Sequence, residues 1–94
     1  MFTLLATAIA NDKNKLYPLH EKHSALIFVL ADGLELAQKR AIQELDALGW
    51  TNVSIGKSKE VTSESFEGKD QTLKDAFNSA QRQGFGVVIY KDPI

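Results

Sequence analysis

The chain has 94 residues, enough for one domain with a single hydrophobic core, and we expect residues 1–94 to form that domain. Apolar residues make up 44% and charged residues 24%, which excludes a disordered composition, and the formal net charge of −1 argues against a nucleic-acid partner. The absence of cysteine excludes disulfides, a thiolate nucleophile and cysteine-ligated zinc, and it favours a cytoplasmic location.

Residues 2–10, FTLLATAIA, form the first predicted element, a strand. The segment is apolar at both alternating sets of positions apart from two threonines, which predicts cover on both faces. It carries no Lys or Arg ahead of a short apolar run, so we interpret it as part of the fold and not as a secretion signal. The longest purely apolar run, residues 25–31, is far shorter than the roughly 20 residues of a membrane-spanning helix, so we expect no membrane segment.

Residues 11–23 form a long predicted connection that holds both histidines of the chain. His20, Glu21 and His23 make an H-E-x-H pattern, one residue shorter than the H-E-x-x-H spacing that places two imidazoles on one helical face. Two interpretations stay open. The histidines are solvated loop residues, or they form a metal or ligand site whose third ligand is Glu21, Asp12 or Asp32.

Residues 24–31, SALIFVLA, predict a central strand, because an unbroken apolar run of this length is typical of burial on both faces. A helix is expected to follow, with Asp32 as its N-cap and Glu35 completing a capping box. Apolar residues that recur at helical spacing predict the face of this helix that packs on the core. The residues of that face are Leu34, Ala37, Ala41, Leu45 and Leu48. Gly49 is predicted to end the helix in the left-handed conformation, with Trp50 folding back on its last turn.

The second half of the chain predicts a short strand at NVSIG, a turn at KSK and a weaker strand over residues 60–67. Asp70 is the expected cap of a second helix that ends at Gly84, and GVVIY forms the closing strand. The expected core face of that helix is Leu73, Ala76, Phe77 and Ala80. The weaker strand carries three carboxylates that form either a solvated edge or an acidic patch for a protein partner. They are Glu60, Glu64 and Glu67.

The two helix-Gly-aromatic-strand stretches match at an offset of 35 residues, which suggests two strand-helix-strand units. We therefore predict an α+β fold, a two-layer sandwich of the ferredoxin-like βαββαβ type. Its sheet has four to five mostly antiparallel strands, with two helices on one face and the other face open.

The chain contains no convergent catalytic motif, so we expect a non-enzymatic protein-interaction or inhibitory module without a cofactor. The alternative is a small-ligand or metal-binding protein, or a minimal enzyme, built on His20, Glu21 and His23. Because the first strand is apolar on both faces, we expect a homodimer to cover the open sheet face. Folding of the 11–23 connection over that face, through Leu16, Tyr17 and Leu19, is the competing explanation.

Overall fold

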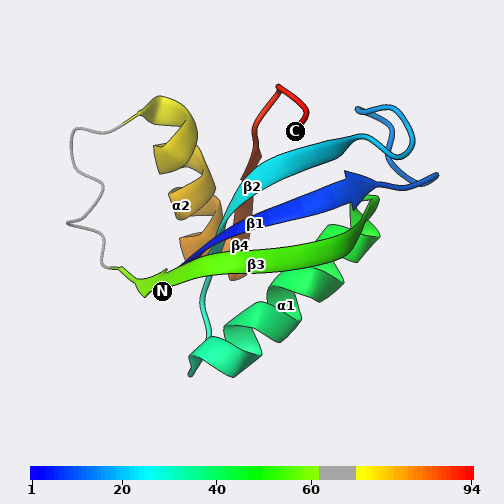
Figure 1. The fold of residues 1–94 in the computed structure, drawn as a ribbon. Helices are drawn as coiled ribbons and strands as arrows, with labels where there is room; N and C mark the ends of the chain where they lie inside the picture. Colours follow the sequence, from blue (N-terminus) through cyan, green and yellow to red (C-terminus); the bar gives the residue numbers. More distant parts are fainter. Residues whose placement is uncertain (62–69) are drawn as a thin grey trace.

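A computed structural model of the chain describes residues 1–61 and 70–94, and within these ranges it contains one four-stranded antiparallel sheet and two helices (Figure 1). The elements are β1 (Phe2–Ala10), β2 (Lys22–Val29), α1 (Leu34–Ala47), β3 (Trp50–Glu60), α2 (Gln71–Gln83) and β4 (Phe85–Ile89). The strand order is β3-β1-β2-β4 and all three pairings are antiparallel. The predicted α+β class is confirmed. The element order is ββαβαβ instead of βαββαβ, because the first connection joins β1 directly to its neighbour β2.

The central strand β2 is buried on both faces, as its apolar run predicts. Ile27, Phe28 and Val29 are each fully buried although consecutive strand residues point to opposite faces. Ile27 and Val29 belong to one core cluster with residues of α1, whereas Phe28 belongs to a second cluster with residues of α2. The two helices therefore pack on opposite faces, and the prediction that they share one face is wrong. A single layer of helices cannot cover both sides of a fully buried strand.

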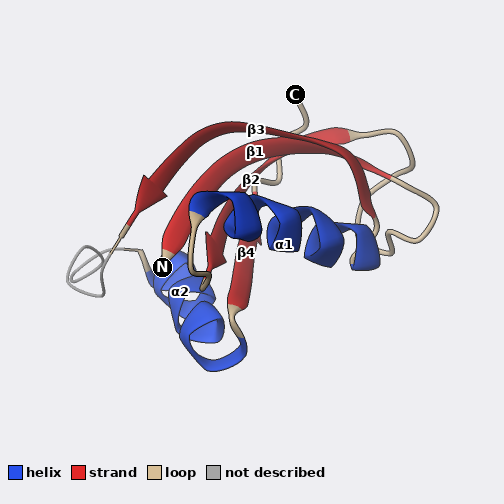
Figure 2. Ribbon diagram, turned by 90° about the horizontal axis from the view of Figure 1, so that it is seen from below, coloured by secondary structure: helices blue, strands red, loops and turns tan. Residues whose placement is uncertain are grey.

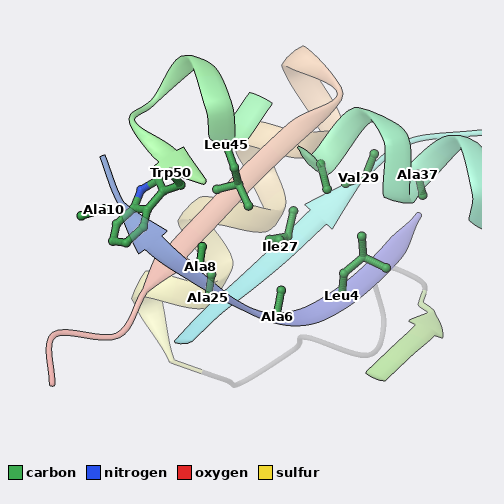
Figure 3. Close-up of a cluster of buried hydrophobic side chains, with 11 residues drawn as sticks. Leu4, Ala6, Ala8, Ala10, Ala25, Ile27, Val29, Ala37, Leu45 and Trp50 are labelled. Atoms are coloured by element: carbon green, nitrogen blue, oxygen red, sulfur yellow. The ribbon is translucent and has the colours of Figure 1, made fainter. Parts of the chain in front are cut away.

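The first core lies on the concave face of the sheet, where α1 runs beneath the arch of β1 and β3 (Figure 2). Its buried members are Leu4, Ala6, Ala8, Ala10, Ala25, Ile27, Val29, Ala37, Ala41, Leu45 and Trp50 (Figure 3). Alanine dominates both the strands and the helix, which lets their backbones approach closely. Only the middle of the predicted helix face is buried, because Leu34 and Leu48 at its two ends are 41% and 52% exposed.

The second core lies between α2 and the β2–β4 side of the opposite face. The ring of Phe77 on α2 meets that of Phe28 edge to face, with centroids 5.9 Å apart. Gly86 of β4 lies so close to α2 that a Cβ atom there would overlap the backbone carbonyl oxygen of Ala76. The predicted buried residues Ala76, Phe77 and Ala80 are confirmed, so α2 presents its apolar face to this side of the sheet.

The helix ends match the sequence prediction at three of four positions. Asp70 caps α2 by accepting hydrogen bonds from the backbone N–H groups of Thr72 at 2.7 Å and Leu73 at 3.4 Å. Gly49 and Gly84 have φ values of 97° and 89°, the left-handed conformation expected after a helix. The predicted cap at Asp32 is wrong: Gly33 occupies the N-cap of α1 and no side chain accepts a hydrogen bond there.

Strand β3 is one long strand, and the turn predicted at KSK is wrong. Lys57 pairs with Leu5 and Lys59 with Thr3 of β1, while Gly56 is an extra residue between the pairings on its two sides. Such a bulge bends the strand without ending its pairing. Polar residues there indicate an exposed edge strand and not a turn. Residues 62–67 of the predicted weaker strand, including Glu64 and Glu67, lie outside the described ranges.

Candidate functional site

His23 lies inside β2 and is fully buried, so its interpretation as a solvated loop histidine is wrong. Strand β2 begins at Lys22, which turns the imidazole of His23 into the concave core. There its ring centroid is 4.3 Å from that of Tyr17 and 5.6 Å from that of Trp50. Aromatic rings on two sides therefore exclude water from a polar side chain.

Both nitrogens of the His23 imidazole have oxygen neighbours at hydrogen-bond distance. Nδ1 lies 2.7 Å from the backbone carbonyl oxygen of Tyr90, and Nε2 lies 2.6 Å from Oε1 of Glu21. A carbonyl oxygen can only accept, so Nδ1 carries a hydrogen and donates it. One further proton is then shared between Nε2 and the Glu21 carboxyl group, either as imidazolium with carboxylate or as neutral imidazole with carboxylic acid.

The connection between β1 and β2 holds Tyr17 over this pair. The Asn14 side-chain oxygen accepts hydrogen bonds from the N–H groups of Leu16 at 3.0 Å and Tyr17 at 2.9 Å, and its amide donates to the Gly49 carbonyl at 3.2 Å. Gly49 is required there, because its φ is positive and a Cβ atom would lie 2.5 Å from the Asn14 backbone. Gly49, at the end of α1, thus holds the segment that places Tyr17 against His23.

His20 does not join the Glu21–His23 pair in the structure. Its side chain is exposed, and its φ of 71° is the left-handed conformation, which histidine adopts more readily than most residues. Asp12 and Asp32, the other carboxylates considered, are also exposed. Residues 1–61 and 70–94 contain no group of three or more His, Asp or Glu side chains placed to hold a metal ion.

The Glu21–His23 contact is expected to stabilise the fold, and substitution of Glu21 tests this. Glu21→Ala leaves Nε2 of a buried imidazole without its partner, so we expect a loss of about 1–3 kcal/mol in the free energy of unfolding. Glu21→Gln should lose less, because an amide N–H can donate to a neutral imidazole. Urea unfolding measures both values. Equal stability of the wild type and both variants would contradict a structural role for this contact.

A second candidate site lies on the convex side of β1 and β3, where neither α1 nor α2 covers the sheet (Figure 2). Leu5 of β1 is 40% exposed there although it sits in the middle of a strand. It lies in a shallow hollow of about 510 Å³. The lining residues, which we call the convex surface, are Thr3, Leu5, Leu26, Lys57, Ser58 and Lys59.

Lysine side chains border the apolar centre of the convex surface. Lys57 stands opposite Leu5 and Lys59 opposite Thr3 in the β1–β3 register, and both lysines are exposed. Neither lysine is among the site residues predicted from the sequence, because the pattern of residues 57–59 predicts a turn. The alternation of Lys57 and Lys59 about Ser58 is the signal that could have identified one face of a strand.

The connection between β1 and β2 does not supply any residue that lines the hollow. Its Tyr17 packs against the first core on the concave side, while Leu16 and Leu19 are 86% and 56% exposed. The explanation that this connection covers the open sheet face is therefore wrong. Glu60, the one described member of the predicted acidic patch, is exposed at the end of β3.

No helix in the described part of the chain is long and apolar enough to span a membrane. Comparison of the chain with protein-family models, with curated proteins and with solved structures found no match.

Proposed function

We propose that this protein is a non-enzymatic protein-interaction or inhibitory module whose binding surface is the convex surface. The observation that carries the proposal is the exposure of Leu5 at the centre of a strand, in a hollow that also exposes part of Leu26. An exposed apolar patch with a polar border is typical of a protein-binding site. The absence of cysteine is compatible with a cytoplasmic location, which we include in the proposal.

A second copy of the chain is the partner expected from the sequence, and it is the first occupant to test. Twofold association would place the convex surfaces of two copies against each other. This would bring Lys57 and Lys59 of both copies into one interface, and like charges oppose such contacts. We therefore favour a different protein as the occupant and keep the homodimer as the competing proposal.

Selection from a random peptide library displayed on phage tests the proposed function without assuming the partner. Selected peptides are expected to bind the wild type and to lose at least about tenfold in affinity for Leu5→Ser, because the apolar centre of the hollow is removed. Leu36→Ser is the matched control, since Leu36 is a 55% exposed leucine on α1. Selected peptides that bind Leu5→Ser as tightly as the wild type would contradict the proposal. A library that yields no binder would also contradict it.

Light scattering over a hundredfold dilution series separates the two occupants. We expect a mass near the 10.4 kDa monomer throughout. A mass near twice this value that falls on dilution, and that Leu5→Ser abolishes, would instead identify a second copy on the convex surface.

The alternative function, a ligand or metal site or a minimal enzyme, is favoured by one observation, the 2.6 Å contact between Glu21 and His23. Two observations argue against this alternative: His23 is fully buried, and both of its ring nitrogens already have oxygen partners. A large fall in melting temperature on addition of a chelator, lost in a His20→Ala/His23→Ala variant, would support the alternative.

A further inference from the structure

We propose that the partner of the convex surface is an acidic, extended peptide segment that presents an apolar side chain and two carboxylates on one side. This inference rests on the proposed function and specifies the chemistry of the partner. It follows from the charges around the hollow, the spacing of those charges and the position of the hollow beside an edge strand.

Among the described residues, every charged residue that a strand places on the convex side of the sheet is a lysine. Lys59, Lys57 and Lys22 stand opposite Thr3, Leu5 and Ile9 of β1, which alternate with the buried core residues of that strand. No ion pair engages Lys57 or Lys59 in residues 1–61 and 70–94.

Glu60 follows Lys59 directly and stands opposite Phe2, which packs against the concave core, so Glu60 belongs to the other face of the sheet. The border of the hollow is thus positive, and it complements a negative partner.

The spacing of the two lysines selects an extended segment. Lys57 and Lys59 are two positions apart on one strand, so their Cα atoms are separated by about 6.6 Å, twice the rise of a strand residue. Carboxylates at alternate positions of an extended peptide have this same spacing. The next position on the same side of the peptide is given an apolar residue, the partner that the exposed Leu5 favours.

Strand β3 forms an edge of the sheet, so its outer backbone groups have no neighbouring strand in the described part of the chain. An extended segment can align with such an edge through its own backbone hydrogen bonds. Lysines on an edge strand also discourage pairing between identical copies, because like charges would meet. The same residues therefore favour an acidic strand and disfavour self-association.

Three fluorescein-labelled peptides of equal length test the inference. Each contains serine at alternate positions, and the intervening positions carry one leucine followed by two glutamates, two glutamines or two lysines. Titration of the wild type is followed by fluorescence anisotropy, and backbone amide spectra of the protein locate the contact. We expect the glutamate peptide to bind about tenfold more tightly than the glutamine peptide, which corresponds to two exposed ion pairs. The lysine peptide should bind most weakly, and added salt should bring the affinities of the three peptides closer together, because it screens both the attraction of glutamate and the repulsion of lysine.

Charge reversal provides the decisive comparison. Lys57→Glu/Lys59→Glu should invert the order, so that the lysine peptide binds best. Lys39→Glu/Lys91→Glu changes the net charge by the same amount at exposed positions on α1 and beyond β4, and it should leave the order unchanged. Amide spectra of both variants show whether they are folded, and both positions of each pair are exposed, so loss of folding is not expected.

The outcomes separate this inference from the proposed function. Equal binding of the three peptides at the amides around Leu5 would overturn the acidic partner while leaving the interaction surface intact. If none of the three designed peptides binds but the library peptides bind in a way that depends on Leu5, the acidic partner is likewise overturned and the interaction surface stands. Failure of both the designed and the selected peptides would overturn the proposed function as well. Tighter binding of a single-stranded oligodeoxynucleotide at the same lysines would replace a protein partner by a nucleic acid.

Discussion

Phe77→Ala is expected to lower the free energy of unfolding by about 3–5 kcal/mol, and Leu45→Ala by about 2–5 kcal/mol. Phe77 is 5% exposed and anchors α2 on Phe28, whereas Leu45 is fully buried and anchors α1 in the concave core. Each truncation removes apolar contacts and leaves a cavity that the surrounding strands can only partly fill. The two substitutions therefore test the two faces of the sheet separately.

Urea unfolding followed by circular dichroism measures both losses. Leu36→Ala is the matched control, because Leu36 is 55% exposed on α1 and its truncation should change stability by no more than about 0.5 kcal/mol. Losses below about 0.5 kcal/mol for both Leu45→Ala and Phe77→Ala would contradict the assignment of these helix faces to the core.

Gly86→Ala is expected to destabilise the protein by at least about 2 kcal/mol, although it adds only one methyl group. That methyl group would overlap the backbone carbonyl oxygen of Ala76, and a backbone atom cannot move aside as the end of a flexible side chain can. The helix α2 would have to lift from β4 and disturb the contact of Phe77 with Phe28. This substitution tests the finding that α2 lies on the face opposite α1.

Gly56→Ala is the control for Gly86→Ala. A Cβ atom at Gly56 would lie 3.6 Å from the carbonyl oxygen of Leu5, an ordinary contact, so this variant should unfold within about 0.5 kcal/mol of the wild type. Urea titration measures the free energy of unfolding of the two variants, and thermal unfolding compares their melting temperatures. A Gly86→Ala variant as stable as Gly56→Ala would place α2 farther from β4 than the structure has it.

The two candidate sites differ in what they can contribute. The Glu21–His23 pair joins β2 to the carbonyl of Tyr90 near the end of the chain and is shielded by Tyr17. Its geometry is that of an internal hydrogen-bond network, which stabilises one arrangement of the chain. The convex surface instead exposes apolar and cationic groups directly, which is why the functional proposals are based on it.

Local patterns in the sequence determined the elements whose stabilisation is local. The Asp70 cap, the glycines at the ends of both helices and the apolar faces of the helices at Leu45 and Phe77 depend on neighbours within a few residues, and the structure confirms them. The unbroken apolar run of β2 likewise predicted a central strand buried on both faces. Burial of that kind requires cover on both sides of the strand, which two helices on one face of the sheet do not provide.

The tertiary structure alone decided which residues meet. His23 and Tyr90 are 67 positions apart, and no spacing within YPLHEKHS indicates that the imidazole turns into the core. The polar run at residues 57–59 is compatible with a turn or with an exposed edge strand, and only its pairing with Leu5 and Thr3 of β1 selects the strand. The side of the sheet that a helix covers depends on how the chain crosses between distant strands, so local hydrophobic periodicity identifies the buried face of α2 but not the face of the sheet that it covers.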